Sequence, residues 1–410
     1  MDRLRVRGLL VALAAATTAS CRERAQAVQS EGELKQMVDQ MAPAVEHRTG
    51  LRFKHHPLVL RRTRAQVRDY VIHKFDRDIS PAELAGVQTA YRLFGLLPDS
   101  LDLRRTMIDL LTEQVAGYYD PDSNALFVPT DIDPAQARIV ISHELVHALQ
   151  DQYVDLDSLV QLKHQNDRRS AAQAILEGQA MLVQLLVLMP EQKVEDLPNF
   201  WDDRNAVGLQ QAQMAVFANA PLWLRQSLIF PYLAGAEFVR WFDHRHPGKE
   251  PFGPLMPTST EQILHADRYD AGDRPVGLAF VRTVPPARDT VRYENDLGEF
   301  ETRLLLEQLL GNEGDAAMRA TGWGGDRYQV LSGTGAADAL VWYSVWDNAA
   351  AADRFVQGLK RAWLQRRSGG PGDRRSEIVR LAVGARPGVR LVDAPVSWTG
   401  WKRLPRVRLQ

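Results

Sequence analysis

The segment that most restricts the fold is residues 137–149, ARIVISHELVHAL, which is apolar on nearly every side yet contains two histidines and a glutamate. Asp133 and Pro134 just before it are typical of a helix start, and they predict a helix that lasts to about Tyr153. A helix that is apolar all round is expected to lie inside a protein core. Imidazoles and carboxylates in a core are costly unless they are paired or bind a metal. The segment therefore predicts a buried helix with a polar site built into it.

The polar residues of this helix have the spacing His-Glu-x-x-His, at His143, Glu144 and His147. Residues four apart in a helix project from one face, so both imidazoles can reach one ion. Glu144 lies beside that ion, where a carboxylate can accept a proton from a polarised water. The chain has one cysteine, near its N-terminus, so histidines and carboxylates must hold any metal in the body of the protein. The alternative is a buried histidine–glutamate hydrogen-bond network without a metal.

A third ligand is expected on the next predicted helix, from Ser170 to just before Pro190. A catalytic zinc site uses three protein ligands and leaves a fourth position for water. Glu177 lies 30 residues after His147 and has apolar neighbours, so we expect it to supply that ligand. Gly178 beside it has no side chain and permits close approach of another helix. The alternative is that Glu177 is a solvated helix residue.

The motif on one helix and a glutamate on the next resemble the gluzincin group of zinc metallopeptidases. The chain is also similar to a family of uncharacterised exported bacterial proteins regarded as metallopeptidases, over most of residues 50–360. This similarity rests on four segments in a fixed order: GYYDP at 117–121, HELVHALQDQ at 143–152, LEGQA at 176–180 and GWGGD at 322–326. It implies a zincin-like catalytic domain, peptide hydrolysis and one zinc ion per chain. It also implies a general base and three ligands, which are Glu144 and the set His143, His147 and Glu177.

One position departs from the gluzincin pattern. Thermolysin-like enzymes have an aspartate four residues after the ligand glutamate, and this chain has Met181 there. A metal-binding imidazole usually donates its other N–H to a carboxylate or a carbonyl. We expect Asp151, one turn beyond His147 on the same helix face, to accept such a bond. A surface aspartate near the helix end is the alternative.

The sequence just before the histidine helix predicts a β-hairpin. Turn residues are clustered at 120–124 between two β-type runs, of which the second is Asn124–Pro129. In the zincin fold the edge strand of the sheet aligns an extended peptide through main-chain hydrogen bonds. Asn124–Pro129 is our candidate for this edge strand, and an ordinary core strand is the alternative.

Two residues are candidates for stabilising the oxyanion that forms during amide hydrolysis, a role usually taken by tyrosine, histidine or arginine. Tyr232 is one, because gluzincins of the aminopeptidase type use a tyrosine from a helix after the glutamate helix. His265 is the other, because thermolysin-like enzymes use a downstream histidine. Each has a structural alternative: Tyr232 as a core aromatic residue and His265 as a histidine at a helix end.

Other histidines and the glycine-rich segment do not predict a second site. His55 and His56 are adjacent in an extended region and should point apart at the surface. His244 and His246 lie at a predicted helix end, where a cation interacts favourably with the helix dipole. Residues 322–327 are expected to form a loop, and they lack the spacing of a phosphate-binding loop, so we do not expect nucleotide binding.

The first 21 residues are typical of a secretory signal peptide. Three arginines precede an apolar run of eight residues that is too short to span a bilayer, and small residues then lead to Cys21. Small residues before a cysteine resemble the lipobox of bacterial lipoproteins, although Thr18 stands where leucine is usual. We expect an exported protein, lipid-anchored in the cell envelope through Cys21 or secreted, with no other membrane contact. An ordinary buried N-terminal helix is the alternative.

Length and composition predict a soluble globular protein of more than one domain. The chain has 410 residues, 45% hydrophobic and 25% charged, and its net charge of −1 argues against a nucleic-acid partner. We expect a mainly helical α+β fold, with a zincin-like domain that holds a small sheet and the active-site helix, and a smaller C-terminal α+β domain. The expected segments are a signal peptide at 1–21, a tether at 22–32, the catalytic domain at 33–285 and the C-terminal domain at 286–410.

The expected function is zinc-dependent hydrolysis of peptide bonds in a peptide or protein substrate, with Glu144 as general base. One alternative is a catalytically inactive, lipid-anchored binding protein with a zincin fold. The intact Glu144 argues against it, because an inactive relative can lose this base without structural cost. The other alternative is a zinc hydrolase of non-peptide amides such as cell-wall cross-links, since the motif positions water for attack on any amide.

Overall fold

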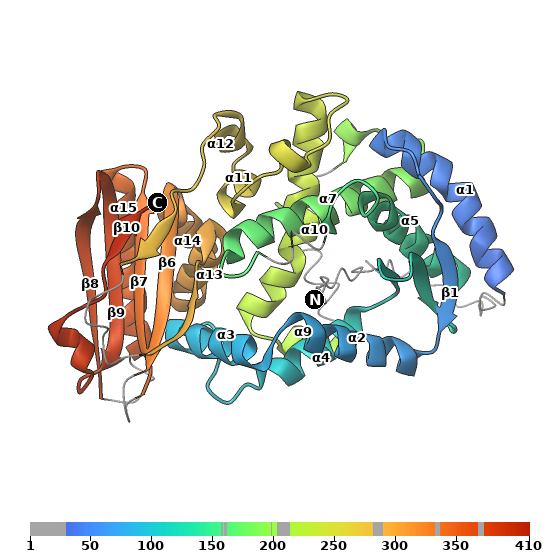
Figure 1. Ribbon diagram of the computed structural model, residues 1–410. Helices are drawn as coiled ribbons and strands as arrows, with labels where there is room; N and C mark the ends of the chain where they lie inside the picture. The colour runs from blue at the N-terminus through green and yellow to red at the C-terminus, as the bar shows by residue number, and fades with distance from the viewer. Residues whose placement is uncertain are drawn as a thin grey trace, which may run out of the picture.

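The computed structural model describes residues 30–410 except 157–158, 160–161, 198, 203–213, 282–289, 333–336 and 368–372. The predicted signal peptide and most of the predicted tether lie outside the described residues, and the first helix already begins at Glu31. The expected mainly helical α+β fold is confirmed: a helical region surrounds a small sheet, and the C-terminal region is built on a larger sheet (Figure 1).

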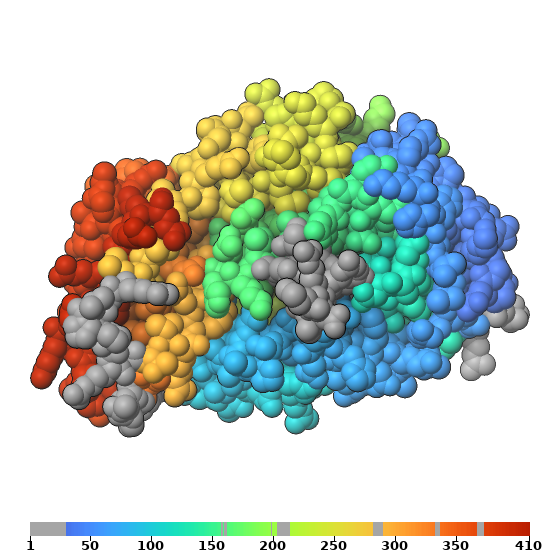
Figure 2. Space-filling view, viewed as in Figure 1, coloured from blue at the N-terminus to red at the C-terminus, as the bar shows by residue number. Residues whose placement is uncertain are grey.

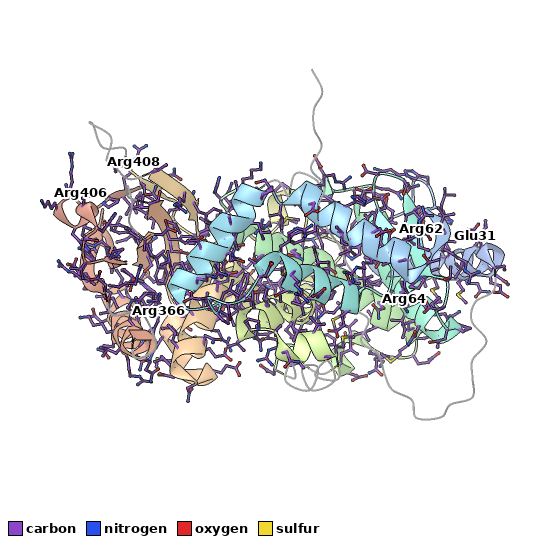
Figure 3. All side chains as sticks on the ribbon, turned by 90° about the horizontal axis from the view of Figure 1, so that it is seen from below. Glu31, Arg62, Arg64, Arg366, Arg406 and Arg408 are labelled. Atoms are coloured by element: carbon purple, nitrogen blue, oxygen red, sulfur yellow. The ribbon has the colours of Figure 1, made fainter. Side chains whose placement is uncertain are left out.

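The molecule is elongated, with α1 and β1 at one end and the C-terminal sheet at the other (Figure 1, Figure 2). Seen from below, Glu31, Arg62 and Arg64 lie at the first end, and Arg406 and Arg408 lie at the opposite end (Figure 3). In chain order, the elements of the helical region are α1 (Glu31–Thr49), β1 (Leu58–Arg62), α2 (Arg64–Asp78), α3 (Pro81–Phe94), α4 (Leu103–Gln114), β2 (Tyr118–Asp120), β3 (Ala125–Pro129), α5 (Pro134–Gln150), α7 (Asn166–Leu188), α9 (Ala215–Asn219), α10 (Leu222–Arg245), α11 (Thr260–Leu264), α12 (Ala266–Asp270) and β4 (Leu278–Phe280).

Helix α5 begins where the sequence predicts. The Asp133 side chain accepts hydrogen bonds from the backbone N–H groups of Ala135 and Gln136, and Pro134 occupies the first turn. The helix ends at Gln150, three residues before the predicted end. Every residue from 140 to 150 is buried or nearly so, as expected for a helix that is apolar on all sides.

The small sheet has the order β1-β3-β2, so β3 is its central strand. Strand β3 is parallel to β1 and antiparallel to β2, and all of its residues are buried. The expectation that Asn124–Pro129 is an edge strand is therefore wrong. The physical reason lies in the run ALFVP, which is continuously apolar and suits a strand that is buried on both faces. The edge strand next to α5 is β2.

Helices α7 and α10 approach each other unusually closely. A Cβ on Gly178 would lie 2.1 Å from the main-chain carbon of Gly235, and a Cβ on Gly235 would lie 1.9 Å from the carbonyl oxygen of Ala174. Helix α7 has the length and composition of a membrane-crossing helix, but 72% of its most apolar 18-residue stretch is buried inside the protein. Its apolar faces are instead covered by α1, α5 and α10, which makes α7 the central helix of the core.

The C-terminal region contains a five-stranded antiparallel sheet of order β5-β6-β7-β9-β8 with α13, α14 and α15 beside it (Figure 1). Strand β4 pairs with β10. The elements are β5 (Thr290–Asn295), α13 (Gly298–Leu310), α14 (Glu313–Ala320), β6 (Trp323–Ser332), β7 (Ala339–Trp346), α15 (Ala349–Arg367), β8 (Arg374–Val383), β9 (Arg386–Pro395) and β10 (Val407–Leu409).

The glycine-rich segment belongs to β6, so the loop predicted over 322–327 is wrong. Strand β6 begins at Trp323, and its register against β7 shifts between Trp323 and Gly325. Gly325 has φ of 145°, and a Cβ there would lie 2.3 Å from the carbonyl oxygen of Val276. Glycines therefore form a bulge and permit close backbone contact, which is their usual role inside a strand.

The two regions share one hydrophobic core. Phe94 of α3 packs edge-on against Tyr328 of β6 and Trp342 of β7, with ring centroids 5.1 and 5.4 Å apart. Helix α13 also packs against α10, where Phe230 and Phe300 stack at 3.9 Å. The C-terminal sheet therefore supports the helices that carry the candidate site described below.

We predict that Gly178→Ala lowers the free energy of unfolding by about 3 kcal/mol, because its Cβ would overlap the backbone of α10. Urea denaturation followed by circular dichroism measures this change. Gly314→Ala in α14 is the matched control, since its Cβ would meet only Asn312 Oδ1 at 3.7 Å and should not destabilise the helix. Equal stability of the two variants would contradict the close packing of α7 on α10.

Candidate metal centre

Three predicted ligands converge in the core. The Nε2 atoms of His143 and His147 lie 3.2 Å apart, and they lie 3.3 and 3.4 Å from Glu177 Oε2. All three side chains are almost fully buried. Donor atoms 2.0–2.1 Å from a tetrahedral centre are about 3.3–3.4 Å apart, so these separations fit one metal ion. The group could therefore hold a metal.

Two glutamines orient the imidazoles. His143 Nδ1 donates to Gln184 Oε1 at 3.0 Å, and His147 Nδ1 donates to Gln150 Oε1 at 2.9 Å. These bonds occupy Nδ1 of each imidazole, so Nε2, which faces Glu177, is the atom that would bind a metal. Neither glutamine was predicted, although Gln184 lies two helical turns after Glu177 and Gln150 lies one turn after His147, on the faces that carry the ligands.

The expectation that Asp151 accepts an imidazole N–H is wrong. Its Oδ2 atom accepts a hydrogen bond from the Tyr119 hydroxyl at 2.9 Å. Asp151 follows the last residue of α5, and its side chain is directed to β2, while Gln150 still lies on the helix. Gln150 is held in turn by hydrogen bonds from its Nε2 to the Leu176 carbonyl and to Gln179 Oε1. An amide network thus takes the place of the expected carboxylate.

Glu144 is fully buried beside the ligands. Its Oε2 atom accepts a hydrogen bond from the backbone N–H of Tyr119 at 2.7 Å, which fixes the carboxylate against β2. Its Oε1 atom, like Glu177 Oε1, is buried without a hydrogen-bond partner among the described residues. Buried oxygens of this kind are costly, and two of them in one site indicate that the site accommodates a ligand.

The charges of the site compensate one another. Burial opposes ionisation of Glu177, but the two histidines outweigh it and lower the pKa of Glu177 to about 2. Burial likewise opposes charge on His147, but Glu177 outweighs it and raises the pKa of His147 to about 9. Burial raises the pKa of Glu144, against the effect of both histidines. Glu177 is therefore ionised and its charge is compensated by a proton on His147, and a metal would compete with that proton for the imidazole nitrogen.

Of the two oxyanion candidates, Tyr232 is the one that lies beside the ligands. Its ring lies 6.0 Å from the His143 ring, at an interplanar angle of 27°. Tyr232 is on α10, three residues before the Gly235 contact with α7. His265 lies where α11 meets α12, and its Nε2 is 2.7 Å from Glu299 Oε1 of α13. The structure therefore places His265 in an ion pair with the C-terminal region.

A cavity of about 340 Å³ lies between α3–α4 and α7–α10. Its walls are mainly apolar and include Leu176 and Pro231, the chain neighbours of Glu177 and Tyr232. The side chains of the histidine group, Glu144 and Tyr232 do not line this cavity, so it is separate from the candidate metal centre.

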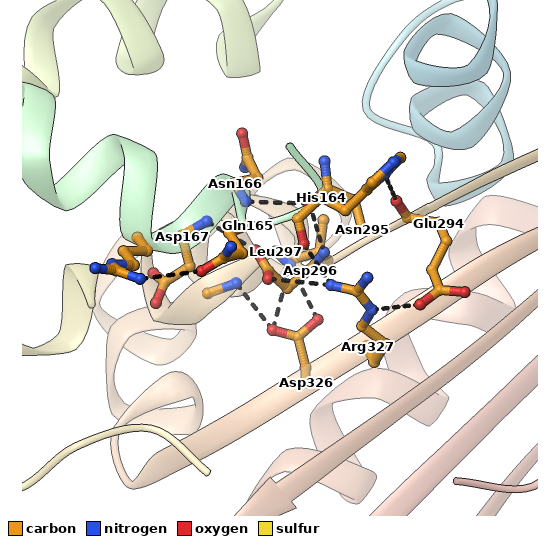
Figure 4. A network of polar contacts seen from close by, with 12 residues as sticks. His164, Gln165, Asn166, Asp167, Glu294, Asn295, Asp296, Leu297, Asp326 and Arg327 are labelled. Atoms are coloured by element: carbon orange, nitrogen blue, oxygen red, sulfur yellow. Dashed lines mark hydrogen bonds and ion pairs between the residues drawn. The ribbon is translucent and has the colours of Figure 1, made fainter. Parts of the chain in front are cut away.

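The start of α7 is anchored to the C-terminal region by a polar network (Figure 4). The backbone N–H of Asp167 donates to Asp296 at 2.8 Å, and that of Asn166 donates to Asn295 at 3.0 Å. Asp326 of the GWGGD segment accepts hydrogen bonds from the backbone N–H of Gly298, at 2.9 Å, and from that of Leu297. This network holds the first turn of the helix that carries Glu177.

Comparisons with known proteins support the chemistry of the site at a general level. A model of the family described as "Putative metallopeptidase family (DUF6782)" matches residues 78–247, which include the three predicted ligands, Glu144 and Tyr232. A second model, described as "Domain of unknown function (DUF8575)", matches residues 288–393. A comparison with curated proteins gave no match.

Among solved structures, the chain is similar to one described as a "putative hydrolase with a novel fold" from Chloroflexus aurantiacus. The identity is 15% and the TM-score is 0.37, over 61% of this chain and 93% of that one. A similarity this low carries no functional argument. The match to the metallopeptidase model supports a hydrolase, and the buried group His143–His147–Glu177 could hold its metal.

We predict that Gln184→Met weakens metal binding by about 10- to 100-fold, because methionine keeps the volume but does not hold the His143 ring. Competition with a chromophoric chelator measures the affinity. Gln357→Met, at an exposed position of α15, is the matched control and should bind metal like the wild type. Equal affinities in both variants would show that Gln184 does not orient His143.

Proposed function

We propose that this chain is a zinc metallopeptidase in which His143, His147 and Glu177 hold the ion. The convergence of two imidazole nitrogens and one carboxylate oxygen at separations of 3.2–3.4 Å carries this proposal. Two histidines and one glutamate are a known ligand set of catalytic zinc, and three protein ligands leave a fourth position for water. When bound, zinc would polarise a water molecule and the scissile carbonyl.

Glu144 is the general base in this proposal. Its Oε2 is held by the Tyr119 N–H, so Oε1 is the atom that accepts a proton from the attacking water. As water oxygen bonds to the carbonyl carbon, Glu144 receives the proton, and it then delivers this proton to the nitrogen of the leaving amine. The carbon–nitrogen bond breaks with that transfer, and Glu144 returns to its starting state.

Tyr232 stabilises the oxyanion of the tetrahedral intermediate in this proposal. Its place beside the His143 ring supports this role over His265, which is paired with Glu299. A hydroxyl that donates to a developing negative charge in a buried site lowers the barrier more than it would in water.

The edge of β2 that no described strand covers is our candidate for aligning the substrate backbone. Strand β3 covers one side of β2, and the N–H of Tyr119 is directed to Glu144 on the other side. An extended peptide that adds to this edge would lie along the general base. Together with the export predicted from the first 21 residues, this suggests a peptide or protein substrate outside the cytoplasm.

We predict that Glu144→Gln retains one zinc per chain and lowers peptide hydrolysis by about 10²–10⁴-fold, because glutamine cannot accept the proton of water. Elemental analysis measures zinc, and cleavage of a denatured protein and a peptide library measures activity. Glu191→Gln, at an exposed position after α7, is the matched control with full activity. No bound zinc in the wild type, or cleavage that survives Glu144→Gln, would contradict the proposal.

We predict that Tyr232→Phe lowers kcat by about 10²–10³-fold with little change in KM or bound zinc, because the proposed bond to the oxyanion forms in the transition state and not with the bound substrate. His265→Gln should instead lower the thermal unfolding temperature, because it leaves Glu299 buried without its cation. Steady-state kinetics and thermal unfolding of both variants test this assignment. A larger loss of kcat in His265→Gln than in Tyr232→Phe would reverse it.

A further inference from the structure

We propose a second cation site, for a hard divalent ion of the calcium class, formed by the carboxylates of Glu261, Asp273 and Asp347. Glu261 is on α11, Asp273 follows α12, and Asp347 directly follows β7. One oxygen of each side chain lies within 4.8 Å of the others. The site lies where the helical region meets the C-terminal sheet, apart from the histidine group.

Glu261 is the residue that indicates a ligand. It is 1% exposed, and its Oε1 atom is buried without a hydrogen-bond partner among the described residues. A carboxylate in this position loses its hydration and gains no bond in return, which is costly. A cation between the three carboxylates would supply the missing contact.

The charge of the cluster also lacks compensation. Arg268 Nη1 lies 2.7 Å from Asp273 Oδ2 and 2.7 Å from Asp347 Oδ2, so one positive charge faces three carboxylates. Fully ionised, the group carries a net charge of −2, from three negative charges and one positive charge. The nearby His265 is paired with Glu299, so its positive charge does not compensate the cluster. A divalent ion would bring the sum to zero.

The pKa of Glu261 agrees with the excess of negative charge in the cluster. Burial, and then the carboxylates of Glu299, Asp347 and Asp273, raise the pKa of Glu261 to about 9, against the effect of Arg268.

The donor atoms select the class of ion. All three are carboxylate oxygens, which suit calcium or magnesium, whereas zinc favours the nitrogen ligands of the histidine group. Oxygens bound to calcium at 2.3–2.6 Å lie at most about 4.6–5.2 Å apart, which accommodates the observed separations. Magnesium requires shorter bonds and a more regular geometry, so the looser calcium is the better fit.

Backbone contacts of the GWGGD segment bring two of the carboxylates, those of Asp273 and Asp347, to the same place. The Val276 N–H donates to the Gly324 carbonyl at 2.7 Å, and the absence of a side chain on Gly325 lets this backbone contact form. The contact brings the loop with Asp273 to β6. The Asp347 N–H donates to the Gly322 carbonyl at 3.0 Å, which places Asp347 on the same side.

The proposed cation site adjoins a residue that holds the start of α7. Thr260, which precedes Glu261, donates from its backbone N–H to Asp167 Oδ1 at 2.9 Å. Asp167 is in the first turn of α7 and belongs to the network of Figure 4. A cation that fixes α11 would therefore also fix the start of the helix that carries Glu177.

Calcium binding to the full-length chain tests this proposal directly. After treatment with EDTA, equilibrium dialysis with radioactive Ca²⁺ should show one ion per chain, with a dissociation constant of about 10⁻⁵–10⁻³ M. The thermal unfolding temperature should rise by about 2–4 °C at saturating Ca²⁺. His147→Ala should bind Ca²⁺ as the wild type does, because His147 belongs to the other site. Less than about 0.2 Ca²⁺ per chain at 10 mM would overturn the proposal.

Two variants are expected to weaken Ca²⁺ binding and one is expected to strengthen it. This difference distinguishes an effect on binding from damage to the fold. Glu261→Gln and Asp347→Asn should weaken Ca²⁺ binding at least about tenfold, since each removes a charged ligand. Arg268→Gln should strengthen it, because the cluster then carries −3 instead of −2. Asp267→Asn, at an exposed position on the same helix as Arg268, is the matched control with unchanged binding. Undiminished binding in Glu261→Gln, or weaker binding in a folded Arg268→Gln, would overturn the assignment.

Discussion

The contact between α7 and α10 at Gly178 and Gly235 determines the geometry of the candidate metal centre. Two backbones in direct contact leave no space for side chains between them, so neither helix can shift without breaking the packing. Glu177 precedes one glycine, and Tyr232 lies one turn before the other. Both side chains are therefore held relative to each other by backbone contact, and α5, which packs against α7, brings the two histidines to them.

Burial makes the polar groups of this centre depend on one another. Two imidazoles and two carboxylates inside a core are stable only as a connected set, because each group has lost its hydration. Glutamines complete this set: Gln150 connects His147 to the backbone of α7, and Gln184 holds His143. An amide gives the imidazole an acceptor without adding another buried charge, which suits a site that already contains two carboxylates.

The C-terminal sheet acts on this centre through the start of α7. The network around Asp167, Asp296 and Asp326 and the aromatic contacts of Phe94 join the sheet to the helical region. The Asp167–Asp296 and Phe94–Tyr328 contacts link segments more than 100 residues apart along the chain. The GWGGD segment is part of this junction: its aspartate accepts bonds from the start of α13, and its glycines admit the backbone of the loop at Val276.

Local patterns in the sequence determined much of the fold and the core of the site. The apolar helix with His143, Glu144 and His147, its start at Asp133 and the buried position of Glu177 follow from helical spacing and burial, which act over a few residues. Spacing did not show that β3 is the central strand, that glutamines rather than Asp151 hold the imidazoles, or that Tyr232 rather than His265 lies beside them. Those features depend on which elements pack together across long chain separations. The sequence by itself thus determined which groups are buried on which helix, whereas only the tertiary structure decided which partners meet them.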